Sequence, residues 1–344
     1  MADGTKIEWT NATWNPITGC TLVSEGCRNC YAAELAVGRL QHHPSRAGLA
    51  RRNAEGQAKF TGEVRFNEGW LDQPLRWTKP RRIFVCAHGD LFHEDVPDAW
   101  IDRVFAVMAL SPQHVFQVLT KRPERMRDYF EPYSQRRADG LSNAVLELGY
   151  TGPLEALQWA LPNVWLGVSV EDQATADARI PLLLDTPAAK RWISAEPLLG
   201  PVDFSPKADA TYQFLSEWYG DEGFDPTGSQ PRQLRRAGYF PRVDWVVVGG
   251  ESGRGARPMH PDWARGLRDQ CAAAEVPFFF KQWGAWLPEG QRDAQNRERD
   301  AVWFADDCNE DELYLFVDGV DAMHLGKKAA GHLLDGVEHR EFPA

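Results

Sequence analysis

Seven short apolar runs constrain the fold of this chain more than any other feature. They are rich in β-branched and aromatic residues, turn residues bound them, and helical patterns separate several of them. They read ATWNPI, RIFVCA, HVFQVL, NVWLGVSV, KRWISA, DWVVVGG and VPFFFKQW. Strands covered on both faces lose the alternation of polar and apolar residues, which is typical of a parallel sheet with helices between its strands. We therefore predict an α/β fold with a partial or closed TIM-type (β/α) barrel.

Two expected connecting helices have clear start signals. The segment VPDAWIDRVFAVMAL places Pro97 in a first turn, with Trp100 and Phe105 on one apolar face. The segment HPDWARGLRDQCAAA repeats this arrangement with Pro261. Cys271 falls on the apolar face of the second helix, so we expect a core residue there and not a ligand.

The spacing of the predicted strands is uneven. We expect insertions near residues 34–77, 129–161 and 203–242, because the gaps there exceed a simple βα connection. After Trp286 the pattern changes, and it predicts a β-hairpin followed by a short helix at the end of the barrel. The expected organisation is a barrel domain over residues 1–287 and an extension over residues 288–344.

Composition excludes some classes of protein. The chain has 344 residues, of which 43% are hydrophobic and 25% charged, as in ordinary soluble domains. It has no apolar leader at the N-terminus and no apolar run near the roughly 20 residues of a membrane span, so we expect a cytoplasmic protein without membrane contact. The net charge of −11 means that any surface for a polyanion must be local.

Three cysteines stand close together in GCTLVSEGCRNCY, at Cys20, Cys27 and Cys30. In a reducing compartment such a cluster is typical of a metal centre and not of disulfides. Three thiolates can hold a [4Fe-4S] cube and leave one iron open, which favours catalysis by the logic that separates catalytic from closed zinc sites. The alternative is a structural zinc ion whose fourth ligand is His42, His43 or His88.

Polar segments follow the other predicted strands at once. They read HGDLFHED, TKRPERM, SVEDQ, SAEPLLGP, GGESGRGARP and KQWGAW. Functional groups of parallel α/β sheets and barrels gather at the carboxyl ends of the strands, because the loops there converge on one rim. We therefore expect these residues and the cysteines to surround one site.

Long motifs in these segments resemble a known family. KIEWTNATWNPITGCTLVSEGCRNCYA, DLFHEDVP, LTKRPERM, LGVSVEDQ, SAEPLLGP, DWVVVGGESGRGARPMHPDW and FFFKQWG carry the resemblance, which extends from Lys6 to about Gly336. Together they are similar to the phage-encoded and prophage-encoded three-Cys-motif family of unknown function. That family resembles radical S-adenosylmethionine (SAM) enzymes and, distantly, spore photoproduct lyase.

The resemblance implies a partial TIM-type barrel whose [4Fe-4S] cluster binds SAM and reduces it to a 5'-deoxyadenosyl radical. Cys20, Cys27 and Cys30 would be the cluster ligands, and Tyr31 a cofactor contact. Six residues separate the first two cysteines, more than in the commonest superfamily pattern, and Asn29 stands where an aromatic residue is usual. The chemistry also needs an electron donor, and a protein from a neighbouring gene is a further expected partner.

Residues after the second and fourth strands are candidate cofactor contacts. His88 and Asp90 stand where radical SAM enzymes often hold the SAM amino group, and a carboxylate pairs well with an ammonium. Asp90 would otherwise be a turn or helix-start carboxylate. Ser169 and Glu171 are placed to bond ribose hydroxyls, or else they cap the following helix.

Residues after the fifth and sixth strands are candidates for catalysis and for close ligand approach. Glu196 precedes Pro197, which biases it away from a helix cap and favours a functional role. Gly249 and Gly250 allow the backbone to approach a ligand closely. The same loop carries an acid, Glu251, expected to be catalytic, and two guanidiniums that could clamp a phosphate or carboxylate, Arg254 and Arg257. A plain flexible connection is the alternative for this loop.

A basic rim is expected from Lys121, Arg122 and Lys281. With Trp283 and Trp286 as stacking faces it would suit a nucleotide, nucleic-acid or carboxylate substrate, and Lys121 is a catalytic candidate. In the alternative, these cations pair with rim carboxylates and the tryptophans seal the barrel mouth.

The leading hypothesis is an iron–sulfur, radical SAM-like enzyme that acts on a nucleotide, nucleic-acid or related substrate. The competing hypothesis is a non-catalytic adaptor of phage origin, stabilised by zinc or an iron–sulfur cluster, that binds nucleic acid or protein. A third is a nuclease or glycosylase whose acids would be Asp90, Glu171, Glu196 and Glu251, although their spacing specifies no reaction.

Overall fold

Seven parallel strands form the centre of the protein. The computed structural model describes residues 4–130, 135–152, 160–204, 242–253, 255–291 and 313–344. The sheet has the order β1-β6-β7-β8-β9-β10-β11, and every neighbouring pair is parallel. All seven predicted strands are confirmed as β1 (Ala12–Trp14), β6 (Arg82–Val85), β7 (Val115–Thr120), β8 (Val164–Ser169), β9 (Lys190–Ala195), β10 (Trp245–Gly249) and β11 (Phe278–Gln282).

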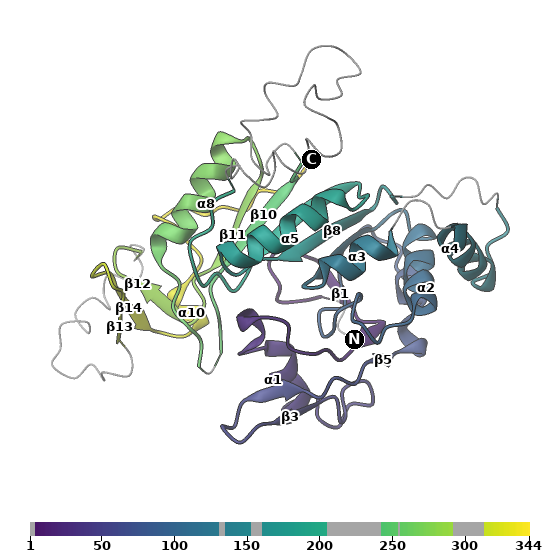
Figure 1. Ribbon diagram of the computed structural model, residues 1–344, viewed down its shortest axis with the longest axis horizontal. Coiled ribbons are helices and arrows are strands. Elements are labelled where there is room, and N and C mark those ends of the chain that lie inside the picture. Colours follow the sequence, from purple (N-terminus) through teal and green to yellow (C-terminus); the bar gives the residue numbers. More distant parts are fainter. Residues whose placement is uncertain (1–3, 131–134, 153–159, 205–241, 254, 292–312) are drawn as a thin grey trace, which may run out of the picture.

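The sheet is a partial TIM-like barrel with β1 and β11 at its two edges. Helices cover its outer face (Figure 1). They are α2 (Asp98–Ala109), α3 (Pro123–Tyr129), α5 (Gln173–Asp185) and α8 (Pro261–Ala273), and α4 (Gln135–Glu147) packs against α2. The two helices with clear start signals are confirmed as α2 and α8. Pro97 is the N-cap of α2 and not part of its first turn, a shift within the usual uncertainty of helix ends.

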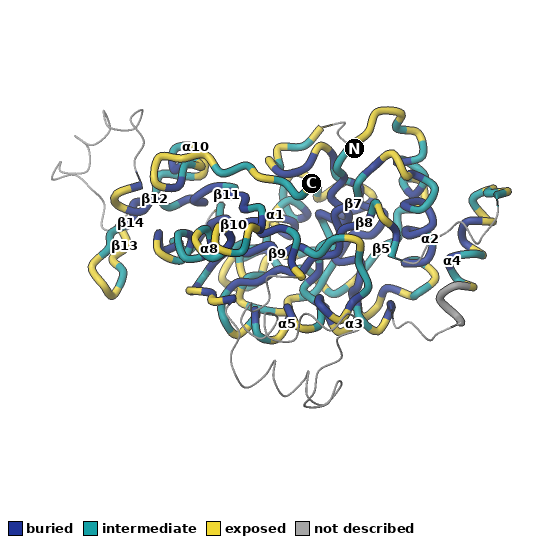
Figure 2. The backbone as a smooth tube through the Cα atoms, turned by 90° about the horizontal axis from the view of Figure 1, so that it is seen from above, coloured by how far each residue is buried: buried dark blue, intermediate teal, exposed yellow. Residues whose placement is uncertain are grey.

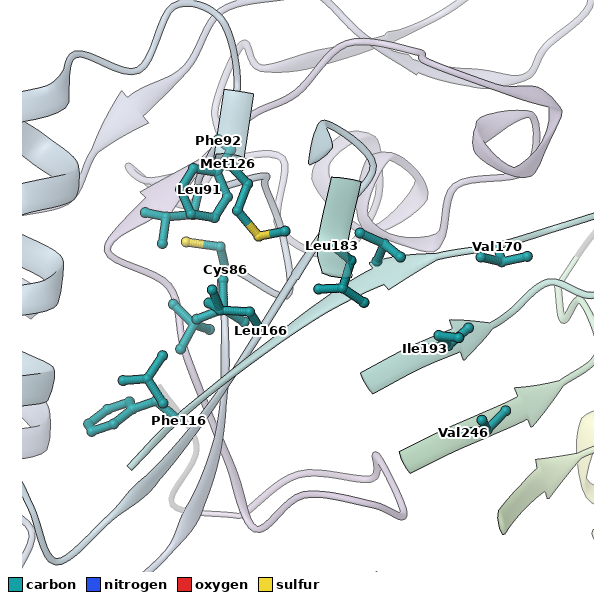
Figure 3. Close-up of a cluster of buried hydrophobic side chains, with 14 of the residues drawn as sticks. Cys86, Leu91, Phe92, Phe116, Met126, Leu166, Val170, Leu183, Ile193 and Val246 are labelled. Atoms are coloured by element: carbon teal, nitrogen blue, oxygen red, sulfur yellow. The ribbon is translucent and has the colours of Figure 1, made fainter. Parts of the chain in front are cut away.

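The main hydrophobic core lies between this outer face and the helices. Strand residues such as Leu166, Ile193 and Val246 point toward it, and Met126 of α3 and Leu183 of α5 pack on them (Figure 3). Successive residues of a strand point to opposite faces of the sheet. The strand neighbours of Leu166, Ile193 and Val246 therefore lie on the inner, concave face. Cys271 is fully buried in the main core, as predicted, and so is Cys86 apart from 3% of its surface.

A second core fills the amino-terminal half of the concave face. It is an aromatic cluster whose main members are Trp9, Phe84, Trp165, Trp192, Trp245 and Phe279. The ring centroids of Trp192 lie 5.2 Å from Trp9 and 5.5 Å from Trp245. Gly167 makes room for this packing, since a Cβ there would stand 2.5 Å from the indole nitrogen of Trp192. This cluster, which we did not predict, uses four of the 14 tryptophans to close the inside of the half-barrel.

The first predicted insertion contains a helix and two small antiparallel sheets. They are α1 (Tyr31–Val37), the hairpin of β3 (Ala50–Arg52) and β4 (Ala58–Phe60), and the pair of β2 (Ile17–Thr18) and β5 (Arg65–Phe66). Three short 3-10 helices complete this region, η1 (Glu25–Cys27), η2 (Glu68–Trp70) and η3 (Gln73–Arg76). The insertion predicted near 129–161 includes α4, and most of the one near 203–242 lies outside the described residues.

The C-terminal extension is a small sheet with the strand order β12-β14-β13. Its strands are β12 (Trp286–Pro288), β13 (Leu313–Leu315) and β14 (Asp321–His324), and α10 (Lys327–Ala330) follows. The predicted hairpin is β13 with β14, and the predicted short helix is α10. β13 is exposed, whereas the central strands are largely buried (Figure 2). The chain then returns to the barrel, where Phe342 packs on Trp245 of the aromatic cluster.

Among the helices that the structure describes, none has both the length and the apolar character that a membrane crossing requires.

Candidate metal centre and its charged surroundings

The three cysteines lie on one loop, residues 19–30, here called the cysteine loop. It follows β2, and its first residue, Gly19, has a φ of 96° and forms an isolated parallel bridge with Gly89 after β6. A Cβ on Gly19 would stand 2.0 Å from the carbonyl oxygen of Glu63, so only glycine fits this close approach. The bridge brings Cys20 to the carboxyl edge of the parallel sheet, as predicted from the strand order.

The thiols of Cys20, Cys27 and Cys30 are partly buried and free. The pKa of Cys20 is raised to about 12. Burial is the largest cause, Asp90 and Cys30 act in the same direction, and Arg122 opposes them. Burial also raises the pKa of Cys30, and Cys27 adds to this effect. The charge of a thiolate at Cys30 is therefore felt at Cys20, and that of a thiolate at Cys27 is felt at Cys30. A metal that binds them must displace their protons.

The cysteine loop supplies three thiols as a donor set, the kind that binds either a zinc ion or an iron–sulfur cluster. Within the described ranges, no group of three His, Cys, Asp or Glu side chains converges closely enough to hold one metal ion. A single zinc ion would need every sulfur at about 2.3 Å. An iron–sulfur cube binds each thiolate through a different iron. Sγ of Cys20 accepts a hydrogen bond from Arg122, a contact that would favour its thiolate as a ligand of either kind of centre.

The candidate histidine ligands are engaged with other groups. Nδ1 of His88 accepts a hydrogen bond from Nε of Arg46 at 3.1 Å. Burial and the nearby charge of Arg46 lower the pKa of His88 to about 4, so its ring is neutral at pH 7. His43 pairs with Ser45 at 2.8 Å, and both His42 and His43 are exposed. The hydroxyl of Tyr31 donates to the carbonyl of Ala87, which places its ring edge against His88.

Asp90 and Arg122 form a buried ion pair beside Cys20. Both are about 5% exposed, and Nη1 of Arg122 lies 3.1 Å from Oδ2 of Asp90. Asp90 also accepts hydrogen bonds from the Thr120 hydroxyl at 2.7 Å and from the backbone N–H of Phe92 at 3.0 Å. Arg122 further donates to Sγ of Cys20 at 3.5 Å and to Glu94 at 2.9 Å. The pair thus joins the loops after β6 and β7 to the cysteine loop, and no substrate contact by Arg122 is needed to explain it.

Glu171, after β8, is the most buried acid of the site, with 1% exposure. It pairs with Lys121 and with Nη1 of Arg179 at 3.0 Å, and it accepts a hydrogen bond from the hydroxyl of Ser24 at 3.1 Å. Burial would raise the pKa of Glu171, but Lys121 and Arg179 outweigh it and lower the pKa. Ser169 is also buried, and its carbonyl accepts from Arg179 at 2.8 Å. The neighbouring Asp172, and not Ser169 or Glu171, is the N-cap of α5.

Glu251, after β10, is bound by Arg257 and Asn29. Arg257 donates to it from its backbone N–H and Nε, both at 2.9 Å, and from Nη2 at 2.7 Å. Nδ2 of Asn29 donates to it at 2.9 Å. Burial would raise the pKa of Glu251, but these hydrogen bonds outweigh it and lower the pKa. Glu251 is therefore an ionised, fully engaged carboxylate next to the cysteine loop. Arg254, from the same loop, lies outside the described residues.

Glu196 and Lys281 pair at the carboxyl end of the concave face. Nζ of Lys281 lies 2.5 Å from Oε1 of Glu196, and both side chains keep some exposure, 13% and 22%. Gly249 faces this pair, because a Cβ there would stand 3.3 Å from the Glu196 carboxyl carbon. Gly250 instead touches the backbone, since its Cβ would meet the Trp283 carbonyl at 1.9 Å. Gly249 thus leaves room for the Glu196 side chain, and Gly250 allows two backbone segments to pack closely.

Trp283 is a correction to the sequence-based expectation of a stacking face. Its side chain has 0% exposure, its ring packs on Phe280, and its indole N–H donates to the carbonyl of Leu333 at 2.8 Å. A ring buried on all sides offers no face to a substrate. The burial agrees with the alternative in which tryptophans seal the end of the barrel. Trp286 is half-buried, and its N–H donates to the carbonyl of Ala256 at 2.6 Å.

Several residues of the site escaped the sequence analysis. Ser24 and Asn29 lie between the cysteines and were assigned no contact from sequence, although each bonds a rim carboxylate. Arg46 and Arg179 were not considered because neither follows a strand. Arg179 stands eight residues after Glu171 on the buried side of α5, a spacing that could have indicated it.

The fold and the site together define a class: a partial (β/α) barrel protein with a three-cysteine loop at the carboxyl edge of its sheet. Within that class the chain belongs to the family described as protein of unknown function DUF5131, whose model matches residues 4–343. No curated protein matches the chain.

Solved structures of spore photoproduct lyase are similar to the chain at low identity. One, a cysteine-to-serine mutant, has 10% identity and a TM-score of 0.36, and the match covers 95% of this chain and 71% of that one. Another mutant, with bound AdoMet and dinucleoside spore photoproduct, also has 10% identity and a TM-score of 0.36, with 91% and 68% covered.

Proposed function

We propose that this protein is an iron–sulfur, radical SAM-like enzyme that acts on a nucleotide or nucleic-acid substrate. One observation carries the proposal: three free cysteine thiols lie on a single loop at the carboxyl edge of a parallel half-barrel. A cube has four irons, so three thiolates leave one iron open at the edge where ligands of such sheets bind. The motif resemblance of the sequence to radical SAM-like proteins supports the same assignment.

The residues around the cysteines are suited to holding such a centre. Cys20, Cys27 and Cys30 would be the ligands, and Arg122 would stabilise the Cys20 thiolate by its hydrogen bond and its charge. When bound, a cube with an open iron supplies one electron to a SAM molecule. The protein's own contribution is orientation and exclusion of water.

The concave face suggests where a substrate would lie. The aromatic cluster closes the amino-terminal half, so a substrate on this face would bind toward the carboxyl edge. Every second residue of a strand lies on the same face of the sheet. Ser169 therefore lies on the concave face with Trp165, Glu196 with Trp192, and Lys281 with Phe279. Lys281 and Glu196 keep some exposure and are the best placed of the candidates to touch a substrate.

A basic surface beside the cysteine loop supports a nucleic-acid or nucleotide substrate. Arg51 and Lys59 are directly opposite each other in the β3–β4 hairpin, and Nζ of Lys59 donates to the carbonyl of Arg28 at 2.7 Å. We call Arg51 and Lys59 the cationic flank, whereas Arg28 is already paired with Glu25 at 3.8 Å. Like charges placed directly opposite in a sheet repel, so an anionic partner would relieve the repulsion. In a chain of net charge −11, this local excess of cations suits phosphates.

Anaerobic reconstitution tests the proposal. The full chain is loaded with iron and sulfide, its iron, sulfide and zinc contents are measured, and SAM and a reductant are then added. We expect about four irons per chain, and formation of 5'-deoxyadenosine that Cys20→Ala, Cys27→Ala and Cys30→Ala each abolish. Zinc without iron would exclude the proposal. Iron and sulfide without cleavage of SAM would instead favour the non-catalytic adaptor.

A further inference from the structure

One ion pair of the loop after β10 forms hydrogen bonds to the cysteine loop on both sides of Cys27. On one side, Nη2 of Arg257 donates to the carbonyl oxygen of Glu25 at 2.9 Å. On the other side, Nδ2 of Asn29 donates to Oε2 of Glu251 at 2.9 Å. Since Glu251 and Arg257 are bound to each other by three hydrogen bonds, their two contacts with the cysteine loop act as one unit. We call this unit the loop clamp.

The loop clamp spans the concave side of the sheet. The cysteine loop follows β1 and β2 at one edge, whereas Glu251 follows β10, which is next to the other edge. The clamp end is itself fixed, because Gly250 packs against the Trp283 carbonyl and the Glu251 carbonyl accepts from the backbone N–H of Ala285 at 2.8 Å. A loop from one edge is thus tied to a rigid point near the opposite edge.

The geometry of Glu251 does not suit a catalytic acid or base. Its side chain is 6% exposed, and both oxygens accept hydrogen bonds from Arg257 or Asn29. A group that exchanges protons with a substrate needs hydrogen-bond access to it. Asn29, by contrast, stands between Cys27 and Cys30, and its side-chain amide donates to Glu251 at 2.9 Å and to the Gly255 carbonyl at 2.7 Å.

From these contacts we infer that Glu251 is a positioning residue: acting through Asn29 and Arg257, it fixes Cys27 and Cys30 in the arrangement that the metal centre requires. The assignment of an iron–sulfur centre rests on the proposed function. The clamp itself is a property of the metal-free chain, so the two can fail separately.

An exchange of side chains tests the clamp. Asn29→Asp places a carboxylate against Glu251, and Glu251→Gln removes the charge that binds Arg257. The double variant N29D/E251Q brings an amide and a carboxylate together again with their places exchanged. The matched control is Asn11→Asp, because Asn11 is exposed and uses only its oxygen, as acceptor from the backbone N–H of Arg82 at 2.8 Å.

The first measurement uses the metal-free protein and needs no iron. The rate at which iodoacetamide alkylates Cys27 is followed by mass spectrometry of its peptide. We expect each single variant to react about tenfold faster than the wild type, which corresponds to a loss of about 1.4 kcal/mol of loop order. The double variant should react more slowly than the roughly hundredfold product of the two single effects, because it removes the repulsion that Asn29→Asp creates with Glu251. Asn11→Asp should not change the wild-type rate.

The second measurement is iron loading with the spectrum of the reduced cluster. We expect both single variants to lose iron to a chelator faster and to show an altered electron paramagnetic resonance spectrum, with a rate of iron loss in the double variant below the product of the two single effects. If the wild type binds no iron, the proposed function fails, and the alkylation result still decides on the clamp. Single variants that alkylate Cys27 at the wild-type rate, or a double variant whose rate is the full product of the two single effects, would overturn the inference.

Discussion

Nη1 of Arg122 donates a hydrogen bond to Sγ of Cys20 at 3.5 Å, and the same guanidinium is paired with buried Asp90. Hydrogen bonds and positive charge at the sulfur ligands are among the factors that set the potential of an iron–sulfur centre. The residue that sequence position had suggested for substrate binding is therefore placed to stabilise a thiolate and to hold the loops around it.

Replacement of Arg122 by Leu should strongly destabilise the metal-free protein. It leaves the charge of Asp90 buried without a partner, which costs about 3–5 kcal/mol. Urea denaturation measures the loss. The double variant R122L/D90N should recover part of it, whereas Arg127→Leu, at an exposed pair with Asp128, should change stability little. Equal effects of Arg122→Leu and Arg127→Leu would contradict this reading of the ion pair.

Gly167→Ala should destabilise the fold by about 1–3 kcal/mol, because overpacking against a rigid indole forces shifts in a dense core. The added methyl would meet the ring of Trp192 at 2.5 Å. Gly266→Ala is the matched control: it lies inside α8 with open space around its Cβ, so the substitution should stabilise by about 0.5–1 kcal/mol. Thermal unfolding of both variants should shift in opposite directions.

His88 makes stability depend on pH. Its folded pKa, about 4, lies below its ordinary value, so between these two values the unfolded chain binds more protons than the folded one. Stability should therefore rise with pH from about 4 to about 6.5. His88→Asn keeps an acceptor for Arg46 and removes the titration, so it should flatten the dependence in denaturant titrations at several pH values. An unchanged slope would show that other groups cause it.

The sheet was predictable because its strands are buried on both faces. Such strands are continuous apolar runs, and each run of this chain became one strand of the parallel sheet. The cysteine loop was predictable for a similar local reason, since spacing alone joins Cys20, Cys27 and Cys30. The aromatic cluster was missed, although Trp165, Trp192 and Trp245 each stand near the start of their strand, a position that brings them together on one face.

The partners of the charged residues were not predictable, because they depend on which loops meet across the sheet. Glu251 could be placed on the rim from sequence, but its contact with Asn29 exists only because the sheet curves enough for the two loops to touch. Trp283 was misread for a related reason. It directly follows β11, where a side chain can reach the mouth or turn into the core, and the carbonyl of Leu333 binds it in the core.

Cys271→Ala should separate packing from metal binding. Its side chain is fully buried among apolar residues of α8 and the sheet, so its loss should cost about 1–2 kcal/mol of stability by leaving a small cavity. Iron content after reconstitution should equal that of the wild type. Cys20→Ala should show the reverse pattern, with little change in metal-free stability and loss of iron. If Cys271→Ala also had a lower iron content per folded molecule than the wild type, the assignment of ligands would need revision.

Reversal of two charges on the cationic flank should weaken nucleic-acid binding and its dependence on salt. In the variant R51E/K59E two opposed cations become anions, and the hydrogen bond of Lys59 to the Arg28 carbonyl of the cysteine loop is lost, so the iron content of the variant is measured beside its binding. If both contact phosphates of a duplex, the slope of log K against log salt should decrease by about 2, since each contact contributes about 0.9. Fluorescence anisotropy with labelled duplex and single-stranded oligonucleotides at several salt concentrations measures it.

The control R76E/R127E makes the same change of charge at exposed arginines of η3 and α3 that pair with acids. Equal loss in both variants would indicate a general effect of net charge, and an unchanged slope in R51E/K59E would remove the flank from the substrate site while leaving the metal centre untouched.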